Sequence, residues 1–201
     1  MLIGLGLGPG NPELLTLRAV RLLREADTVF VPGRIAFNLV APYRDSVILK
    51  FPMTDDESQI RECLLENADK IAPAAQKGLA VFGILGDPNF FSTFSRLCSI
   101  LAEKYPTIEY RTEPGISSIT AFAAAANISL NEGFTVSDGP EPDSRILLKV
   151  KHPKEKADEL RREGYREFVL VERMYFADMK VYRNDDLPEK SDYLSVMYAR
   201  R

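Results

Sequence analysis

The sequence has no tryptophan, a single histidine and only two cysteines among its 201 residues. Cys63 and Cys98 lie far apart, and neither has a Cys or His partner at metal-ligand spacing, which argues against a disulfide framework and a zinc site. We expect both to be buried apolar side chains of a reduced, cytoplasmic protein. His152 precedes Pro153 in a charged loop, so triad chemistry and multi-histidine metal sites have almost no residues to use. The protein itself should therefore hold no metal.

Long hydrophobic runs and an excess of one charge are also missing. No run approaches the ~18 apolar residues of a membrane helix, and residues 1–4 lack the basic and apolar regions of a signal peptide. The 26 Lys and Arg against 29 Asp and Glu give a net charge of −3, with a pI near 5.4. We therefore predict neither a membrane nor a nucleic-acid partner, and any anionic ligand must meet a local basic patch.

What is present is an ordinary globular composition, 45% hydrophobic and 27% charged, in a chain long enough for one large or two small domains. In the first half, short apolar runs alternate with helix-period segments, which predicts βαβ units around a largely parallel sheet. The expected strands are 2–3, 28–31, 47–49, 79–85 and 107–110, and the expected helices are 14–26, 60–75 and 92–104.

We place a domain boundary near Thr112, which gives an N-terminal α/β domain, 1–112, and a C-terminal α+β domain, 113–201, with a mixed sheet. The second domain should contain helices at 117–127 and 154–163, and strands at 134–136, 145–150, 168–172 and 193–199. Residues 137–144, with Gly139 and two prolines, predict a loop.

Local signals mark several helix ends. Asn11 before Pro12 suits an N-cap, and Thr16 offers a second cap if the turn at Pro12 is a separate short piece. A capping box, Thr54 with Glu57, opens the long helix 60–75, in which Pro73 predicts a late kink or break.

The first segment that can carry chemistry is the glycine-rich run 4–10, GLGLGPG, between a strand and a helix. Backbone could approach a ligand closely there, or the run could be only a tight connection. It fails the dinucleotide fingerprint, because Pro9 stands where the third glycine belongs, and no Gly-Lys-Ser/Thr of a phosphate-binding loop follows.

Two further segments follow predicted strands. Residues 83–94 contain Gly86-Asp87-Pro88 and two phenylalanines, which could hold a cation beside an aromatic ring or form a turn with Ser92 as N-cap. Residues 113–121 place Ser117 and Ser118 at the opening of an alanine-rich helix, where they could bind an adenosine edge or a carboxylate, or simply cap the helix.

Taken together and in this order, the run 4–19, Gly86-Asp87-Pro88 and residues 114–118 resemble the tetrapyrrole methylases, the S-adenosylmethionine-dependent enzymes of cobalamin and sirohaem synthesis. The resemblance covers essentially the whole chain. Residues 29–32, 86–94 and 192–197 are most similar to members that methylate C20 of precorrin-2 or cobalt-precorrin-2. Neither the Gly-Arg-Gly of sirohaem-type members nor the Thr-Thr-His of diphthine synthases follows the Gly-Asp-Pro loop. The loop 137–144 is shorter than in typical members.

This resemblance implies two α/β domains with the cofactor S-adenosylmethionine in a cleft between them, a tetrapyrrole substrate and a homodimer. By motif position, the implied cofactor contacts are Leu7, Pro9, Gly86, Asp87, Phe90, Ser117, Ser118, Val150, Leu194 and Ser195. For the polycarboxylate substrate we propose backbone contacts at Gly8 and Gly10, and carboxylate contacts by Arg34 and Arg96.

The implied chemistry is an in-line methyl transfer, in which holding the reacting carbon and the methyl group in near-attack geometry is worth up to ~7–11 kcal/mol, so that no side-chain nucleophile is required. The proton that must leave C20 could go to Asp87, Glu113, a substrate carboxylate or water, and no catalytic residue is assigned. Two other functions fit the same motifs: methylation of another ring position, and non-catalytic binding of an adenosine metabolite.

Overall fold

The computed structural model describes residues 1–52, 54–131, 133–136 and 143–201. They form two compact units, Met1–Gly133 and Phe134–Arg201, each of which is described by itself. The division falls after the predicted boundary near Thr112, because strand β5 (Tyr110–Glu113) pairs with the first strand and the loop after it packs on the same sheet.

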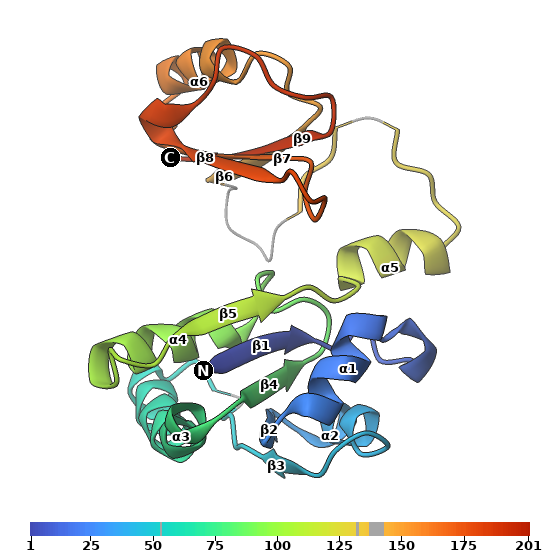
Figure 1. Ribbon diagram of the computed structural model, residues 1–201, viewed down its shortest axis with the longest axis vertical. Coiled ribbons are helices and arrows are strands. Elements are labelled where there is room, and N and C mark those ends of the chain that lie inside the picture. Colours follow the sequence, from blue (N-terminus) through green and yellow to red (C-terminus); the bar gives the residue numbers. More distant parts are fainter. Residues whose placement is uncertain (53, 132, 137–142) are drawn as a thin grey trace. The chain divides into compact units, whose positions relative to one another are not determined.

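The first unit is built on a five-stranded parallel sheet in the order β3-β2-β4-β1-β5 (Figure 1). Its strands are β1 (Leu2–Gly6), β2 (Thr28–Val31), β3 (Ser46–Ile48), β4 (Ala80–Ile84) and β5. Its helices are α1 (Leu17–Glu25), α2 (Arg34–Val40), α3 (Glu57–Lys77), α4 (Thr93–Lys104) and α5 (Ser118–Ala125), with a 3-10 turn at Pro12–Leu14. The predicted parallel α/β arrangement is confirmed.

Helices cover both faces of this sheet (Figure 1). Alternate residues of β1 point to opposite sides, so Leu2 joins the core under α3 and α4, whereas Ile3 and Leu5 join the core under α1 and α2. All three side chains are fully buried. The two cores hold the carboxyl ends of the strands in fixed positions along one edge of the sheet.

Helix starts follow short polar side chains, though not always those expected. Thr16 and Ser92 cap α1 and α4 as predicted, since each hydroxyl accepts a backbone N–H of the first turn. The predicted box at Thr54 is wrong: Asp56 is the cap, and its carboxylate accepts the N–H groups of Ser58 and Gln59 at 2.9 and 3.2 Å. These two bonds lower the pKa of Asp56 below its usual value.

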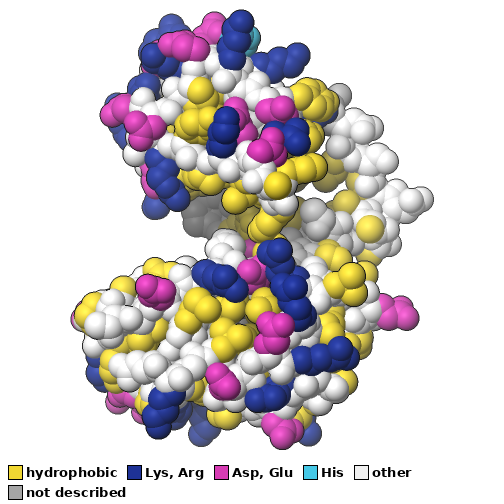
Figure 2. All heavy atoms as spheres, in the orientation of Figure 1, with side chains coloured by type: hydrophobic (Ala, Val, Ile, Leu, Met, Phe, Trp, Pro, Cys, Tyr) yellow, Lys and Arg dark blue, Asp and Glu magenta, His cyan; other side chains and the backbone are white. Residues whose placement is uncertain are grey.

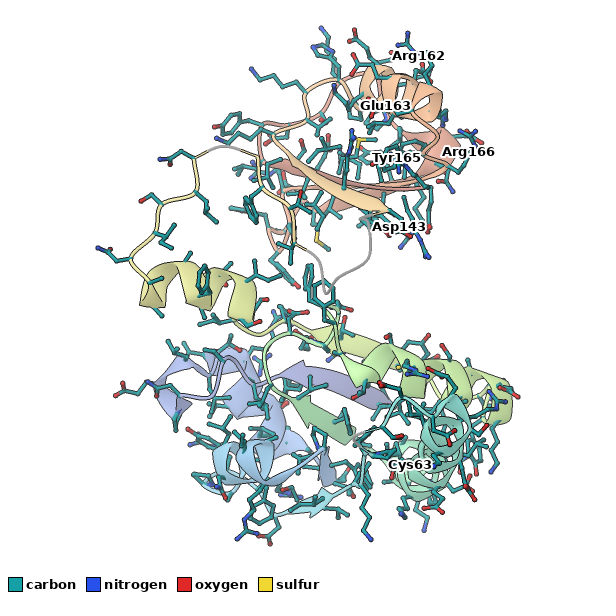
Figure 3. The ribbon with its side chains drawn as sticks, turned by 180° about the vertical axis from the view of Figure 1, so that it is seen from behind. Cys63, Asp143, Arg162, Glu163, Tyr165 and Arg166 are labelled. Carbon is teal, nitrogen blue, oxygen red and sulfur yellow. The ribbon has the colours of Figure 1, made fainter. Side chains whose placement is uncertain are left out.

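Of the kink or break predicted at Pro73, the break does not occur. α3 continues through Pro73 to Lys77, with Ile71, Ala72 and Ala75 buried against the sheet on both sides of the proline. That packing holds a turn whose backbone lacks one hydrogen bond. Cys63, also on α3, is only half-buried and donates from Sγ to the carbonyl of Lys50 at 2.9 Å, so the expectation of a buried thiol holds for Cys98 alone (Figure 3).

The second unit is a four-stranded sheet in the order β6-β9-β7-β8, with one helix, α6 (Pro153–Arg162). Its strands are β6 (Ser144–Leu148), β7 (Glu167–Glu172), β8 (Lys180–Arg183) and β9 (Ser195–Arg200), and a 3-10 turn at Asn184–Asp186 follows β8. Every pairing is antiparallel, so the predicted mixed sheet is wrong: β9 lies between β6 and β7, and the short connection from β7 allows β8 to return only antiparallel. Residues 134–136, predicted as a strand, pair with no strand in the described chain, and the predicted loop 137–144 lies mostly outside the described residues.

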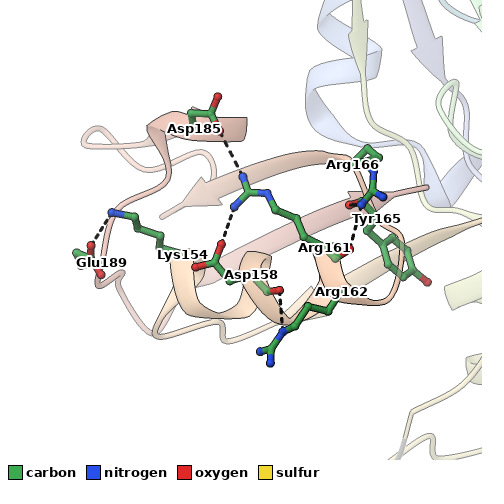
Figure 4. A network of polar contacts seen from close by, with 8 residues as sticks. All are labelled: Lys154, Asp158, Arg161, Arg162, Tyr165, Arg166, Asp185 and Glu189. Atoms are coloured by element: carbon green, nitrogen blue, oxygen red, sulfur yellow. Dashed lines mark hydrogen bonds and ion pairs between the residues drawn. The ribbon is translucent and has the colours of Figure 1, made fainter.

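One face of the second sheet packs under α6 around Leu160, Phe168 and Met197. Charged side chains fasten α6 to the loop after β8: Lys154 contacts Glu189 at 2.7 Å, and Arg161 bridges Asp158 and Asp185 at 2.8 and 3.4 Å (Figure 4). On the opposite face, Ile146, Leu148 and Val181 are between 49% and 68% exposed.

Candidate functional site at the carboxyl edge of the parallel sheet

Three neighbouring strands of the first unit end in the three segments that the sequence singles out. β1 lies between β4 and β5, with Gly6 in register with Ile84 and Leu5 in register with Glu113. Because carboxyl ends of parallel strands share one edge, the loops after these strands must meet there. Residues separated by more than one hundred positions in the sequence thereby become neighbours.

The glycine-rich loop and the Gly-Asp-Pro loop are joined by an isolated β-bridge. Gly86 donates to the carbonyl of Gly8 at 2.8 Å, Gly8 donates back at 3.3 Å, and Leu7 donates to Ile84 at 2.8 Å. Gly8 has a φ of +72°, and a Cβ there would lie 2.8 Å from the Leu14 carbonyl oxygen. Only glycine fits this position.

The third loop lies against the first two. A Cβ on Gly115 would lie 2.3 Å from the carbonyl oxygen of Gly86 and 2.7 Å from the Cα of Gly6, so the three backbones touch. A Cβ on Gly86, by contrast, would have only the backbone nitrogen of Ser118 within 4 Å, at a distance of 3.9 Å. The cluster is therefore packed on one side and has free space on the other.

Asp87 holds the second and third loops together. Its side chain is buried, with Oδ1 accepting the N–H of Asn89 at 2.9 Å and Oδ2 accepting the N–H of Gly115 at 3.2 Å. Asn89 in turn donates to the hydroxyl of Thr112 at 3.2 Å. Both carboxylate oxygens thus accept hydrogen bonds from backbone N–H groups, and the first role of Asp87 is to link the two loops. Asn89 is a member of this cluster that the sequence reasoning missed.

Glu113 forms a second link between segments of this cluster. This buried carboxylate ends β5 and accepts from Arg18 of α1 at 3.0 Å, with Arg111 3.8 Å away. α1 follows the glycine-rich loop directly, so the ion pair ties that loop to Pro114 and Gly115. The Arg18 and Arg111 side chains are about half exposed, which leaves positive charge at the edge of the cluster.

The remaining predicted residues of the first unit differ in accessibility. Ser117 caps α5 by accepting from Ile119 at 3.2 Å, and Pro9 and Ser118 are exposed. Phe90 is 43% exposed and thus offers an apolar surface beside the loops. The Leu7 side chain is fully buried, so any contact of Leu7 with a ligand must be made by its backbone.

The two proposed substrate arginines lie in the first turns of the helices that follow β2 and β4, at the same edge. Arg34 is the first residue of α2, a helix that the sequence reasoning missed, and its guanidinium lies 5.2 Å from the centre of the Phe37 ring. Arg96, on α4, forms an ion pair with Glu57 at the start of α3. Arg96 is therefore already matched by a carboxylate.

In the second unit, Val150, Leu194 and Ser195 are neighbours. The buried Ser195 hydroxyl donates to the carbonyl of Val150 at 2.7 Å, and Leu194 is 47% exposed. Leu194 and Ser195 line a cavity of about 300 Å³ together with Met174, Phe176 and Tyr193, which the sequence reasoning did not select. Tyr193 lies in the segment 192–197 that carries the family resemblance but was not chosen as a site residue, whereas Met174 and Phe176 stand in a loop without a motif, and only the fold brings them to this place.

Other site types find no support in the described residues. None of their His, Cys, Asp and Glu side chains form a group of three that could hold a metal ion. Within the same ranges, no helix has the length and apolar character needed to span a membrane. Positive and negative side chains are interspersed over the visible faces of both units (Figure 2).

Comparison with known proteins supplies the decisive observation. Residues 1–185 match the model of the Tetrapyrrole (Corrin/Porphyrin) Methylases. The chain belongs to the tetrapyrrole methylases. The family predicted from the three motifs is thereby confirmed, and these motifs are the segments that meet at the edge of the parallel sheet.

Among relatives of this methylase, the Methanocaldococcus jannaschii protein named as a probable cobalt-precorrin-2 C(20)-methyltransferase is 32% identical over 98% of this chain and 95% of its own. The cobalt-precorrin-2 C(20)-methyltransferase of Salmonella typhimurium is 31% identical over 72% of this chain and 66% of its own. A solved uroporphyrin-III-C-methyltransferase from Thermus thermophilus shares the fold, with a TM-score of 0.52 and 24% identity over 99% of this chain and 91% of that one.

Proposed function

We propose that this methylase transfers a methyl group from S-adenosylmethionine to C20 of precorrin-2 or cobalt-precorrin-2. The observation that carries the proposal is the meeting of the glycine-rich, Gly-Asp-Pro and Pro-Gly-Ile loops at one edge of the sheet, in a chain similar over nearly its whole length to a protein named for that reaction. The proposed working place is the cytoplasm, in keeping with the two free cysteines.

The described residues fit such a cofactor. Space lies beside Gly86, and the exposed Phe90 ring and the hydroxyls of Ser117 and Ser118 border the same loops. When bound, the cofactor supplies a methyl group on a positively charged sulfur. The role of the loops is to position it, and an apolar, water-poor surface favours loss of the sulfur's charge as the methyl group moves.

Within this proposal, Leu7, Pro9 and Gly86 contact the cofactor by backbone or ring atoms, whereas Asp87 holds the loops that surround it. Val150, Leu194 and Ser195 of the second unit remain proposed contacts. Because Leu194 is exposed and its neighbour Ser195 carries the hydrogen bond to Val150, Leu194→Ala tests this part without removing that bond.

The proton released from C20 needs an acceptor. Asp87 already accepts hydrogen bonds from two backbone N–H groups, and Glu113 is already held in ion pairs with two arginines. Of the four possible proton acceptors named in the sequence analysis, we therefore favour a substrate carboxylate or water. Asp87→Asn and Glu113→Gln should then lower kcat through loop position while the pH–rate profile keeps its shape, whereas loss of one limb of the profile would identify the replaced residue as the base.

For the substrate, Arg34 is the stronger carboxylate contact, since in the described residues it has an aromatic neighbour and forms no ion pair, whereas Arg96 is paired with Glu57. Gly8 and Gly10 remain proposed backbone contacts.

We also propose a homodimer, for which light scattering should return about twice the 22.6 kDa of one chain. A mass equal to one chain at micromolar concentration would reject it.

The experiment is incubation with precorrin-2 or cobalt-precorrin-2 and S-adenosylmethionine labelled with ¹³C in its methyl group. Mass spectrometry counts the methyl groups added, and NMR assigns the labelled position. One methyl at C20 supports the proposal. A methyl at another carbon identifies a different ring-position methylase, and cofactor binding without turnover of either substrate identifies a binding module.

A further inference from the structure

A cluster of arginine side chains lies at the end of the second sheet that the proposed function does not use. β9 runs from Ser195 to Arg200, so its last residue is about 17 Å along the strand from the proposed cofactor contact at Ser195. The backbone N–H of Arg166 donates to the Arg200 carbonyl at 2.7 Å, and that of Arg201 donates to the Asp143 carbonyl at 3.0 Å. The start of β7, the end of β9 and the residue before β6 therefore meet at this end.

Two of these arginines are held at the end of α6 (Figures 3 and 4). Arg166 Nη1 donates to the carbonyls of Arg161 and Tyr165 at 3.0 and 3.1 Å, and Arg162 Nε donates to the carbonyl of Asp158 at 3.3 Å. Carbonyl groups at a helix C-terminus carry only partial negative charge, so they position the two cations without neutralising them. Within the described residues, the other N–H groups of both exposed guanidiniums have no acceptor.

Tyr165 positions two further guanidiniums. It is only 2% exposed, and the guanidiniums of Arg145 and Arg201 lie 5.0 and 5.1 Å from the centre of its ring. Stacking on an aromatic ring restricts the orientation of a guanidinium and leaves its N–H edge free for a planar acceptor such as a carboxylate. Arg145 already has such an acceptor in Glu163, at 2.8 Å. Arg201 forms no ion pair with any residue that the structure describes.

We call Arg162, Arg166 and Arg201 the arginine patch. None of the three takes part in an ion pair within the described chain, whereas Arg145 and Arg200 beside them are each matched by a carboxylate. Three neighbouring cations without a counter-ion are a local exception in a chain of net charge −3. Such a surface attracts an anionic partner over about a Debye length, ~8–10 Å.

Carboxylates among the arginines restrict the kind of anion. Asp143, Glu163 and Glu167 are exposed in the same cluster. The closely spaced phosphates of a nucleic acid would be repelled by these carboxylates while they contact the arginines. In a protein segment the carboxylates stand apart on separate side chains, so each can pair with one arginine and avoid the acidic positions. This arrangement favours a protein partner over a nucleic acid.

We propose that the arginine patch is the docking surface for an acidic segment of a partner protein. Each guanidinium pairs with one carboxylate of that segment, and because the guanidiniums are already held by carbonyl groups or by the Tyr165 ring, less side-chain freedom is lost on binding. The patch shares no residue with the proposed cofactor and substrate contacts, so the proposal goes beyond methyl transfer.

The test uses a fluorescently labelled octaglutamate peptide, whose binding is followed by fluorescence anisotropy at low and at physiological ionic strength. The parent protein should bind the peptide, and added salt should weaken the complex. Arg162→Gln combined with Arg166→Gln should lower the affinity about five- to thirtyfold, the loss of two exposed ion pairs. Arg44→Gln removes an exposed arginine of the first unit that is in no ion pair with the described residues, and this control should bind like the parent.

Two further variants separate docking from folding. Arg201→Gln leaves the carbonyl contacts at the end of α6 in place, so it should weaken peptide binding about two- to fivefold with little change in melting temperature. Arg162→Lys combined with Arg166→Lys keeps both charges and should retain most of the affinity.

The peptide binding no better to the parent than to the Gln variants, or not at all, overturns the proposal. A labelled single-stranded DNA of matched length that binds more tightly than the peptide, and loses affinity in the same variants, assigns the patch to phosphates and also overturns it. None of these measurements involves S-adenosylmethionine or a tetrapyrrole, so their outcome is independent of the methylation assay.

Discussion

Removal of the Asp87 carboxylate should loosen the loop cluster as a whole. In Asp87→Ala, the N–H groups of Gly115 and Asn89 lose the oxygens that accept them at 3.2 and 2.9 Å. A donor left without an acceptor costs about 1–3 kcal/mol, and the Asn89 amide can regain part of that from water because Asn89 is exposed. We therefore expect a loss of roughly 2–4 kcal/mol in the first unit.

Asp87→Asn refines the estimate. It has nearly the same shape but keeps one accepting oxygen, so it should cost about half as much as the alanine variant. Urea unfolding followed by circular dichroism gives the overall effect, and hydrogen exchange of peptides covering 110–118 reports on the Gly115 amide itself. Asp45→Ala, which removes an exposed carboxylate of the same unit, serves as control.

Cofactor affinity provides the second readout. If Asp87 acts by holding the loops, faster exchange at Gly115 and weaker S-adenosylmethionine binding should appear together in both Asp87 variants. Weaker binding with unchanged exchange would instead place the carboxylate in direct contact with the cofactor. Unchanged stability and unchanged exchange in Asp87→Ala would show that Asp87 does not hold the two loops together.

Four further expectations follow from the same geometry. Gly8→Ala should destabilise the first unit by about 1–3 kcal/mol, because its φ is +72° and the new Cβ meets the Leu14 carbonyl, whereas Gly33→Ala, where a Cβ meets nothing within 4 Å, should be close to neutral in thermal melts. In the folded protein at pH 8, a thiol reagent should modify Cys63 well before Cys98, because burial raises the pKa of the Cys98 thiol to about 12; equal rates would show that Cys98 is accessible. Asp69 accepts from Lys104 and Tyr105, both at 2.6 Å, and its pKa is lowered chiefly by the Lys104 bond; its stabilising effect should therefore be present above about pH 4 and fade as the pH falls through the lowered pKa, and Asp69→Asn should flatten stability against pH in that range. Arg34→Leu should raise KM for the tetrapyrrole more than Arg96→Leu does, with little change in cofactor affinity, and an equal effect on both affinities would indicate a structural role.

The parallel sheet was predictable because its inner strands β1, β2 and β4 are buried on both faces and therefore appear as short apolar runs between helices. The shared edge of the three loops was predictable from the same pattern, since each follows a strand. What the sequence does not show is which loops touch. That Gly115 lies against Gly86 depends on β5 pairing with β1 and not with another strand.

The sequence-based predictions failed where tertiary contacts, and not local sequence, decide the structure. Residues 34–40 form a helix too short for its periodicity to be seen, although Gly33 and Arg34 mark its start. Phe134, Thr135 and Val136 suggest a strand by composition, but a strand exists only with a partner. The cavity at Leu194 needed the fold, because Met174 and Phe176 stand in a loop without a motif.

The order of strands in the first unit also determines when its ligand-binding edge can form. Leu2 pairs with Ala80 on one side and with Tyr110 on the other, so β1 waits for partners made much later in synthesis. Contacts this distant in sequence close slowly, and β1 keeps an apolar, unpaired edge until they do. A nascent chain that has not yet reached β4 therefore leaves both backbone edges of β1 unpaired, as a surface for chaperones or for aggregation, and the loop cluster cannot be complete before β5 pairs.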